Sequence, residues 1–515
     1  MMKDAWDAIV IGSGMGGMVT AAALSRLGHK VLMLEQYNSL GGQTHSFSRE
    51  GFSWDAGIHY LGGLGPDGAE KAVLDWLCDS PIEFAPVGPV YDTLHIGDSD
   101  PLQLSRPMAA QRMDLKERFP DEAKAIDAWF DTLADGKDAL SVVGQVRSFP
   151  SVLESAVWWW RGTKYRRYCE RTTAEIACEI TSNAELAKVF VSQWADFGGR
   201  PGTASFAIHA AVTWSYLEAG AYYPVGGASV IAEHLLPTIT KNGGETRAGT
   251  EVSSVIIENG AVTGVETADG EKFLAKHVIS DIGARETVDR LLPDGHGHEH
   301  WADAIRAIGP NICHYSLFLG FSGDVEAAGM TKSNHWLFPT GDVDVTWTNT
   351  PDGKPPAMFV SFASLKDPAH DPGPDRKYAG ELIAWSDWST VEQWADIPPD
   401  NRGEEYRSFR KAIESTLLEQ FAHYFPRLAE LIVFHEVSTP LATASITGHR
   451  RGSFYGLDVT PQRITSDALR MKTPLPGLYL TGQDVLSPGI PGAFWGGILA
   501  AAGIEPKVFM KMRGS

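Results

Sequence analysis

Six residues near the start of the chain have the spacing of a nucleotide-binding turn. The segment Gly12-Ser13-Gly14-Met15-Gly16-Gly17 satisfies the pattern GxGxxG, follows the apolar segment Asp7–Ile11 and precedes a helix-forming segment, Met18–Leu27. In such a turn Gly12 permits the tight bend, Gly14 lets the backbone approach a diphosphate, and Gly17 lets the helix pack close to the strand. The diphosphate is expected at the helix N-terminus, where unpaired N–H groups and the helix dipole favour negative charge.

A carboxylate follows at the position where a ribose is recognised. Glu35 ends the second predicted strand, Lys30–Glu35, and can accept hydrogen bonds from ribose hydroxyls while repelling a 2′-phosphate. This disfavours NADP. The pair Gly41-Gly42 comes shortly afterwards, and such a pair lets the chain pass close to further phosphates and a ribityl chain. A nicotinamide domain would continue with alternating strands and helices, whereas this chain leaves the sheet, so FAD is the predicted cofactor.

The C-terminal region supplies the other half of the predicted cofactor site. Gly477–Leu480 is a predicted strand, Thr481–Asp484 a turn and Gly492–Ala502 a helix. Gly482 lets the backbone approach the cofactor, and Asp484 either binds a ribityl hydroxyl, lies near the diphosphate or caps its own turn. A helix that begins near Gly492-Ala493 would point its positive end at the flavin pyrimidine and stabilise the reduced anionic flavin.

Several side chains near these segments are candidates for catalysis. His59 and Tyr60 follow the first cofactor segment, and Trp495, with its neighbour Phe494, lies at the start of the last helix. An imidazole titrates near working pH, so His59 is a candidate proton donor; the alternative is a core histidine bonded to backbone. Trp495 is either packing or catalytic, and His449 could reach the site from another domain.

Two domains must position these residues, because single cores stop growing near roughly 250–300 residues and the chain has 515. The predicted fold class is α/β: a Rossmann-like FAD-binding domain, with GxGxxG and a β-meander, plus an inserted mixed α+β substrate domain. The predicted FAD-binding domain is discontinuous and comprises residues 1–70, 220–300 and 441–515. The predicted substrate-binding or cap domain comprises residues 71–219 and 301–440.

Periodicity supports this division. Residues 71–219 are predicted to be helical, with Ala109–Asp135 and Asn183–Phe197 as the clearest segments. The predicted meander consists of three strands, Glu251–Glu258, Ala261–Ala268 and Glu271–Ile279, with the turn signal Asn259-Gly260 between the first two. A further helix is predicted over about Tyr406–Phe425.

Composition excludes several classes of function. The net charge of −20 repels phosphate backbones, so nucleic acid is not an expected partner. The four cysteines form no CxxC pair and no zinc-ligand pattern, so no metal site is predicted and the thiols are expected to be reduced. No signal peptide or spanning helix is apparent, which predicts a cytoplasmic protein, soluble or peripheral to a membrane.

One segment is both aromatic and basic. Residues Trp158–Arg167 read WWWRGTKYRR, and tryptophans favour the lipid interface while cations favour lipid headgroups. Two interpretations remain open: a local membrane contact at the substrate entrance, or a helix with buried tryptophans and a solvated basic face.

At this point the sequence resembles the phytoene desaturase and carotenoid isomerase superfamily of flavoproteins. The resemblance extends from residue 7 to about 505 and is closest to the retinol saturase-like branch. It is carried by GSGMGG, by Glu35 with Gly41-Gly42, by DAGIHY at 55–60, by YPVGG at 223–227 and by YLTGQD at 479–484.

This resemblance implies an amine-oxidase-like architecture and FAD bound without a covalent link. It also implies an FAD-dependent oxidoreductase that desaturates, saturates or isomerises carbon–carbon double bonds in a long apolar lipid such as a carotenoid, retinoid or unsaturated fatty acid, by hydride transfer at flavin N5. By analogy, Val252 contacts the adenine through its backbone. Gln36, which follows Glu35, is also a predicted cofactor-binding residue. Gln43 stands where many relatives carry a basic residue, and Thr44 or His45 would compensate.

Two other functions remain open. A flavin amine oxidase would need an aromatic cage beside the flavin, and a non-catalytic lipid escort on the same fold would lack the intact glycine fingerprint that this chain has. The sequence does not specify the direction of electron flow, the redox partner or the oligomeric state.

Overall fold

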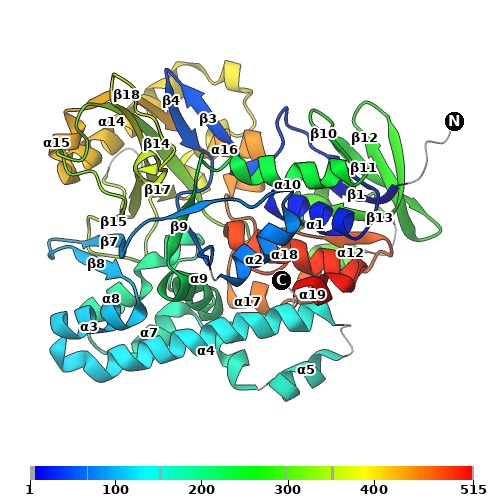
Figure 1. Cartoon of the computed structure of the whole chain (residues 1–515), viewed down its shortest axis with the longest axis horizontal. Coiled ribbons are helices and arrows are strands. Elements are labelled where there is room, and N and C mark those ends of the chain that lie inside the picture. Colours follow the sequence, from blue (N-terminus) through cyan, green and yellow to red (C-terminus); the bar gives the residue numbers. More distant parts are fainter. Residues whose placement is uncertain are drawn as a thin grey trace.

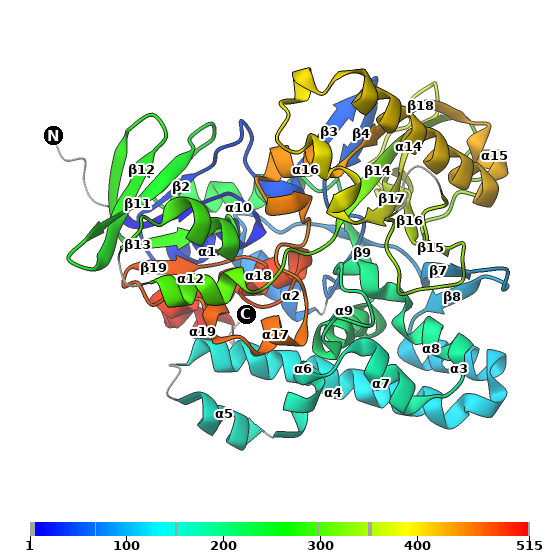
Figure 2. The same cartoon turned by 180° about the vertical axis from the view of Figure 1, so that it is seen from behind.

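Two seven-stranded sheets lie side by side in the computed structural model of the chain, and a helical layer runs beneath both (Figures 1 and 2). The structure describes residues 6–66, 68–149, 153–161, 163–295, 298–348 and 353–512.

The first sheet contains the predicted nucleotide-binding strands. Its order is β10-β2-β1-β13-β12-β11, with β19 also paired to β13. The strands are β1 (Trp6–Ile11), β2 (Val31–Leu34), β10 (Glu245–Arg247), β11 (Val252–Glu258), β12 (Ala261–Thr267), β13 (Lys272–Ser280) and β19 (Leu478–Leu480). β10, β2, β1, β13 and β19 are parallel, so their carboxyl ends meet at one edge, where open α/β sheets bind ligands.

The predicted meander is present as β11, β12 and β13. These strands pair in antiparallel order, and Asn259 (φ 51°) and Gly260 (φ 76°) both have positive φ in the turn between the first two. Two consecutive positive φ values suit the twist of a tight hairpin. Because β13 also pairs with β1, the meander extends the parallel sheet.

Three helices cover one face of the first sheet: α1 (Met15–Arg26), α10 (Val230–Lys241) and α18 (Gly489–Ile504). Gly28 (φ 89°) terminates the first of them, as predicted. The last begins at Gly489 and not near Gly492, which corrects the predicted start. Pro491 lies in its first turn, where a missing N–H costs no hydrogen bond.

The second sheet has the order β18-β14-β17-β16-β15-β7-β8. Its strands are β7 (Val90–Ile96), β8 (Leu102–Ser105), β14 (Cys313–Ser322), β15 (Asn334–Phe338), β16 (Met358–Ser361), β17 (Lys377–Ser386) and β18 (Ile432–Ser438). Helix α14 (Gly403–Tyr424) packs on one face through an apolar core, close to the predicted helix 406–425. Region 71–219 was predicted to be helical, but it also contributes β7 and the edge strand β8 to this sheet.

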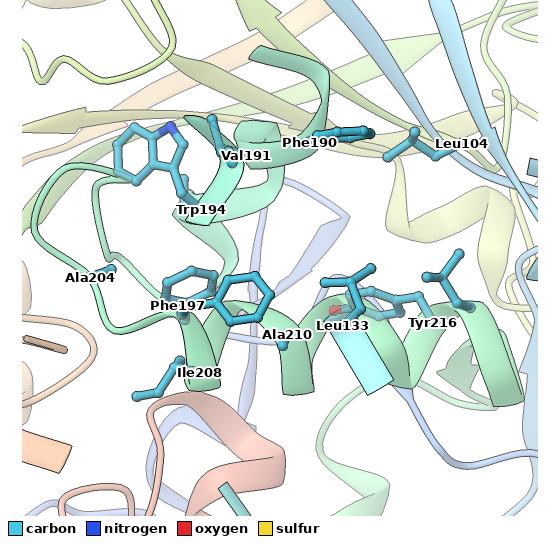
Figure 3. Packing of buried hydrophobic residues seen from close by; sticks show 14 of the residues in the cluster. Leu104, Leu133, Phe190, Val191, Trp194, Phe197, Ala204, Ile208, Ala210 and Tyr216 are labelled. Carbon is cyan, nitrogen blue, oxygen red and sulfur yellow. The ribbon is translucent and has the colours of Figure 1, made fainter. Parts of the chain in front are cut away.

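The helical layer consists mainly of α3 (Met108–Arg118), α4 (Ala123–Ser148), α7 (Thr173–Ile180), α8 (Ala184–Val191) and α9 (Phe206–Ala219). The predicted helix Ala109–Asp135 is divided at Phe119-Pro120, because proline cannot donate the helical hydrogen bond and excludes the preceding residue from helical geometry. The apolar core of this layer is formed by α4, α8, α9 and the segment after α8, as Leu133, Phe190, Tyr216 and Trp194 show in Figure 3.

A short hairpin, β3 (Ser46–Arg49) and β4 (Phe52–Asp55), connects the two halves of the molecule. The Trp54 indole donates to the carbonyl oxygens of Leu319 (3.3 Å) and Gly380 (3.0 Å) in the second sheet. Strands β5 (Leu61–Gly62), β6 (Phe84–Pro86) and β9 (Ala221–Pro224) form a small third sheet. All strands of the first sheet fall within the predicted FAD-binding segments, whereas the hairpin belongs to them by sequence but packs on the other sheet. The exact domain limits stay a prediction.

Candidate active site

A single cavity of about 670 Å³ begins at the carboxyl ends of the parallel strands and extends to the second sheet. Its inner wall includes the predicted glycine turn, Glu35 and Gly482. Its far wall includes alternate residues of β14, namely His314, Ser316 and Phe318. The cavity therefore joins the predicted nucleotide site to the sheet of the predicted substrate domain.

The glycine turn is packed so closely that side chains would not fit. A Cβ on Gly16 would come within 3.0 Å of the Gly482 backbone, and a Cβ on Gly42 would lie 2.9 Å from the Cα of Gly14. Gly14 is the N-cap of α1 and carries no side-chain cap, so the helix N-terminus opens directly onto the cavity. This arrangement suits an anionic diphosphate, which takes its hydrogen bonds from backbone N–H groups.

Glu35 holds the turn in place and faces the same cavity. Its Oε2 accepts hydrogen bonds from the backbone N–H (2.9 Å) and the hydroxyl (2.7 Å) of Ser13, and its Oε1 accepts from Tyr37 N (2.8 Å). The Ser13 hydroxyl in turn accepts from Gly41 N (3.0 Å), which ties the second glycine pair to the first. A carboxylate has about four acceptor positions, so one remains for a ribose hydroxyl.

Asp281 is a site residue that the sequence analysis missed. It follows β13 directly, and its carboxyl group lies against Gly14, Gly16 and Gly17. The pKa of Asp281 is raised to about 8, mainly by burial and also by the charges of Glu35 and Asp484, while hydrogen bonds from the backbone N–H groups of Gly17 and Gly14 act in the opposite direction. A protonated carboxyl group does not repel a diphosphate. The only signal in the sequence is an acid at the end of a strand, which becomes informative once β13 is known to pair with β1.

Most of the predicted cofactor residues line the cavity. They are Gly12, Gly14, Gly16, Glu35, Gln36, Gly42, Gln43, Val252, Gly482, Asp484 and Ala493. Asp484 also has a structural role, since its two oxygens accept from Ala284 N (2.8 Å) and Leu457 N (3.0 Å). It therefore joins three loops, and these two bonds go to residues far from its own turn, which differs from the turn-capping alternative.

Three predicted cofactor residues, Gly17, Thr44 and Gly492, do not line the cavity but support the residues that do. A Cβ on Gly17 would meet the carbonyl oxygen of Gly12, so this glycine serves helix packing as predicted. The Thr44 hydroxyl donates to Gly41 O (2.8 Å) and fixes the second turn. Gly492 packs against Ser487 inside α18 and does not begin the helix.

The predicted catalytic residues His59, Tyr60 and Trp495 are not among the residues that line the cavity, and their part in catalysis stays a prediction. The His59 carbonyl oxygen accepts a hydrogen bond from the Lys366 ammonium (3.0 Å), and the Tyr60 hydroxyl donates to Asp92 of the second sheet (3.1 Å). Burial lowers the pKa of His59 to about 3, so the ring is uncharged at neutral pH. The Trp495 side chain bonds the carboxyl group of Glu70 on the other side of α18.

His449 lines the cavity, as do several residues that sequence reasoning did not identify. Gln43 and Gln483 both donate to the carbonyl oxygen of Phe454 (3.4 and 3.3 Å), so this loop closes over the cavity between the two domains. The outer part of the cavity lies between the hairpin, β18, α14 and α16 (Pro440–Thr447). It has apolar walls from Phe47, Tyr406 and Leu441.

Residues 15–376 match the family described as flavin containing amine oxidoreductase. An all-trans-retinol 13,14-reductase of Danio rerio is 28% identical over 96% of this chain and 84% of its own. A second Danio rerio protein, described as an inactive all-trans-retinol 13,14-reductase, is 29% identical over 97% of this chain and 86% of its own. A chloroplastic prolycopene isomerase of Arabidopsis thaliana is 24% identical over 97% of this chain and 82% of its own.

Solved structures share the fold. An oxidoreductase from Methanosarcina mazei superposes with a TM-score of 0.60 at 17% identity, covering 95% of this chain and 98% of the other. Cyclohexylamine oxidase from Brevibacterium oxydans superposes with a TM-score of 0.59 at 16% identity, covering 98% and 99%. The predicted amine-oxidase-like fold class and the predicted resemblance to the retinol saturase-like branch are both confirmed.

No helix in the described ranges is long and apolar enough to cross a membrane.

Proposed function

The chain belongs to the flavin-containing amine oxidoreductase family, and from this premise we propose that it is an FAD-dependent oxidoreductase acting on a carbon–carbon double bond of a long apolar lipid. The observation that carries the proposal is similarity along almost the whole chain to proteins named for reactions on retinol and prolycopene, together with a cavity that continues past the nucleotide site. A retinoid or carotenoid is the proposed substrate class.

The residues of the cavity fit FAD as the form of the flavin. Gly14 and Gly16 leave room for a diphosphate at the N-terminus of α1, Glu35 would accept a ribose hydroxyl, and Val252, Gln483 and Ala493 would also hold the cofactor. When bound, the flavin supplies or accepts a hydride.

The outer cavity suits an apolar substrate. An isolated alkene has no polar group to bind, so its affinity comes from apolar burial, at about 25 cal/mol per Å². Phe47, Phe318, Tyr406 and Leu441 provide such a wall, and Phe454 lies between it and the nucleotide site. These side chains bind and orient the lipid, and they exclude water from the reacting bond.

The test separates cofactor, substrate and turnover. Denatured purified protein should release FAD, identified by mass spectrometry. The reduced holoenzyme, kept anaerobic, should saturate or isomerise all-trans-retinol or prolycopene, and the products are read by chromatography. Because one relative is described as inactive, FAD content and turnover are measured separately. FAD-loaded protein that converts neither lipid, nor an unsaturated fatty acid, overturns the proposal.

Amine oxidation is the second candidate, since cyclohexylamine oxidase shares the fold. Cyclohexylamine and putrescine, added aerobically to the oxidised holoenzyme, would then release hydrogen peroxide. Lipid turnover without peroxide from either amine supports the first proposal. Protein that binds lipid but no FAD would indicate the escort function.

We also propose a local membrane contact at the end of α5 (Glu154–Arg161), which overlaps the first residues of the aromatic segment 158–167, of which Gly162 lies outside the described residues. Trp159 is 79% exposed and Trp160 is 70% exposed. Lys164 and Arg166 are paired with Asp135 and Glu170, so the indoles and not charge would drive binding. The helix lies on the outer side of α4 (Figures 1 and 2), and no residue of it lines the cavity, so no entrance role is proposed.

Vesicle sedimentation tests this contact. Phosphatidylcholine vesicles should retain the wild-type protein and should lose W159A/W160A, whereas V433A, at another exposed apolar residue, should bind like the wild type. Equal binding of all three proteins contradicts the contact.

A further inference from the structure

One row of polar side chains crosses the cavity-facing side of the second sheet. Residues paired across neighbouring strands present their side chains to the same face, and Phe318 lines the cavity. Phe318 pairs with Glu436 on one side and with Glu381 on the other, and Glu381 pairs with Ser361. The row continues to Asn334, because His335 pairs with Val360, and then to Asp92, which pairs with Asn334.

On β17, β16, β15 and β7 the polar row is confined to one register position. The next position toward Ser316 carries Ile383, Phe359, Trp336 and Leu94, which are apolar. Within the polar row, Glu381 is 7% exposed, Ser361 1%, and Asn334 and Asp92 are fully buried. Burying polar groups in an apolar core is costly unless each finds a partner, so a single buried polar row calls for an explanation.

Hydrogen bonds connect the deep half of the row. Asn334 Nδ2 donates to Asp92 Oδ1 (3.1 Å), and the Lys366 ammonium donates to Ser361 Oγ (2.7 Å), to Asn334 Oδ1 and to the carbonyl oxygen of His59 (3.0 Å). Lys366 thereby fixes the backbone that follows the cofactor-lining residue Ala56. This half of the row therefore positions the loop of Ala56 and His59, which lies between the two domains.

Glu381 is the buried acid of the row nearest the cavity. Its side chain is hydrogen-bonded to Ser316, whose side chain faces the cavity. Of the described basic residues, only His59 lies within ion-pair distance, with Nδ1 3.9 Å from Glu381 Oε2. The pKa of Glu381 is raised to about 8, mainly by desolvation and also by the charge of Asp55, with the Ser316 hydrogen bond acting in the opposite direction. Since the pKa of His59 is lowered to about 3, no neighbouring cation favours the carboxylate.

We propose that Glu381 delivers, through the Ser316 hydroxyl, the proton that completes saturation of the substrate double bond. This inference rests on the proposed function and gives it a direction. The π bond breaks, one carbon gains a hydride from the reduced cofactor, which loses two electrons, and its neighbour gains the Ser316 proton. Ser316 takes a proton from Glu381, and solvent water later restores the acid. A neutral acid donates a proton readily and accepts none, so this site suits reduction and not desaturation.

The first test observes the proton without turnover. Infrared spectra of the oxidised holoenzyme are recorded for wild type, E381Q and the control E419Q, which changes an exposed acid on α14. The wild-type minus E381Q difference should contain the carbonyl band of a protonated carboxyl group at pH 6, and the band should disappear as the pH rises through about 8. E419Q should retain it. Absence of the band at pH 6 overturns the assignment to Glu381.

The second test follows the proton into product. Reduced holoenzyme in D2O should place one solvent deuterium on a saturated carbon of all-trans-retinol. E381Q and S316A should lower this rate about 100-fold or more, with normal FAD content and normal reduction by dithionite, and E381D should recover part of it. Wild-type rates in E381Q overturn the inference alone. If wild type converts no lipid while the band is present, the proposed function fails and the proton delivery fails with it.

Discussion

Glu35 accepts two hydrogen bonds from a single residue, Ser13, one from its backbone N–H at 2.9 Å and one from its hydroxyl at 2.7 Å. The carboxylate at the end of β2 thus shapes the glycine turn at the end of β1 before any ligand binds. The Ser13 hydroxyl also accepts a hydrogen bond from Gly41 N. The positions of three segments, those of Ser13, Glu35 and Gly41, therefore depend on the Glu35 side chain.

Glu35→Ala should weaken FAD binding. The variant loses a ribose acceptor and leaves Ser13 N without its partner, and hydrogen bonds to charged groups contribute about 1.5–3 kcal/mol, or about 10- to 150-fold in Kd. Fluorescence titration of apoprotein with FAD measures the change. Glu258→Ala, at an exposed position of β11, is the control and should bind like the wild type. An unchanged Kd in Glu35→Ala would exclude a role for this carboxylate.

Gly16→Ala should prevent FAD binding and lower the melting temperature. The added Cβ would come within 3.0 Å of the Gly482 backbone. Backbone atoms, unlike side chains, cannot relieve such a clash by changing rotamer. Gly309→Ala is a matched control, because a Cβ there meets no atom within 4 Å. Thermal unfolding with and without FAD tests both variants. A Gly16→Ala protein that FAD stabilises as strongly as wild type contradicts the close packing.

The nucleotide half of the site was predictable because its requirements are local. A tight turn needs glycines at fixed spacing, and Gly12, Gly14 and Gly17 stand where those requirements place them. Asp281 was not predictable, because its importance arises only when β13 pairs with β1. His59 does not line the cavity although Ala56, three residues earlier, does, because the His59 ring lies beside the carboxyl group of Glu381 on another strand, 3.9 Å away.

The polar row depends on register across the second sheet, which no short sequence pattern specifies. Glu381 is flanked in its strand by Ala379-Gly380 and Leu382-Ile383, and Lys366 precedes a polar loop in which a lysine would be expected to be solvated. The buried surroundings of Glu381 and Lys366 arise only when β14, β16 and β17 pair in the folded protein.

Asp281→Asn should stabilise the apoprotein at neutral and alkaline pH. The folded-state pKa of about 8 lies above the ordinary value of 3.8, so the unfolded state releases this proton first as the pH rises. The wild type therefore loses stability between about pH 4 and 8, whereas the asparagine variant does not. Denaturant unfolding at pH 4.5 and pH 8 measures the difference, which should be small at the lower pH. FAD affinity of the wild type should also fall above pH 8, because an ionised Asp281 repels the diphosphate. A difference in stability that is equal at both pH values contradicts the raised pKa.

Lys366→Met should have the opposite pH dependence. Burial lowers the pKa of Lys366 to about 7 from 10.5, so between these values the unfolded state binds more protons than the folded state. The stability of wild-type apoprotein should therefore gain from this group as the pH rises from 7 toward 10, by at most about 1.4 kcal/mol per pH unit. The methionine variant should lack this contribution, and at pH 9 it should be the less stable protein, because Asn334 and Ser361 lose a buried partner. Lys332→Met, which changes an exposed lysine, controls for loss of surface charge. Urea unfolding of the three proteins at pH 6.5, 8 and 9.5 decides the matter: parallel profiles for wild type and Lys366→Met would mean that the lysine titrates as if it were in water.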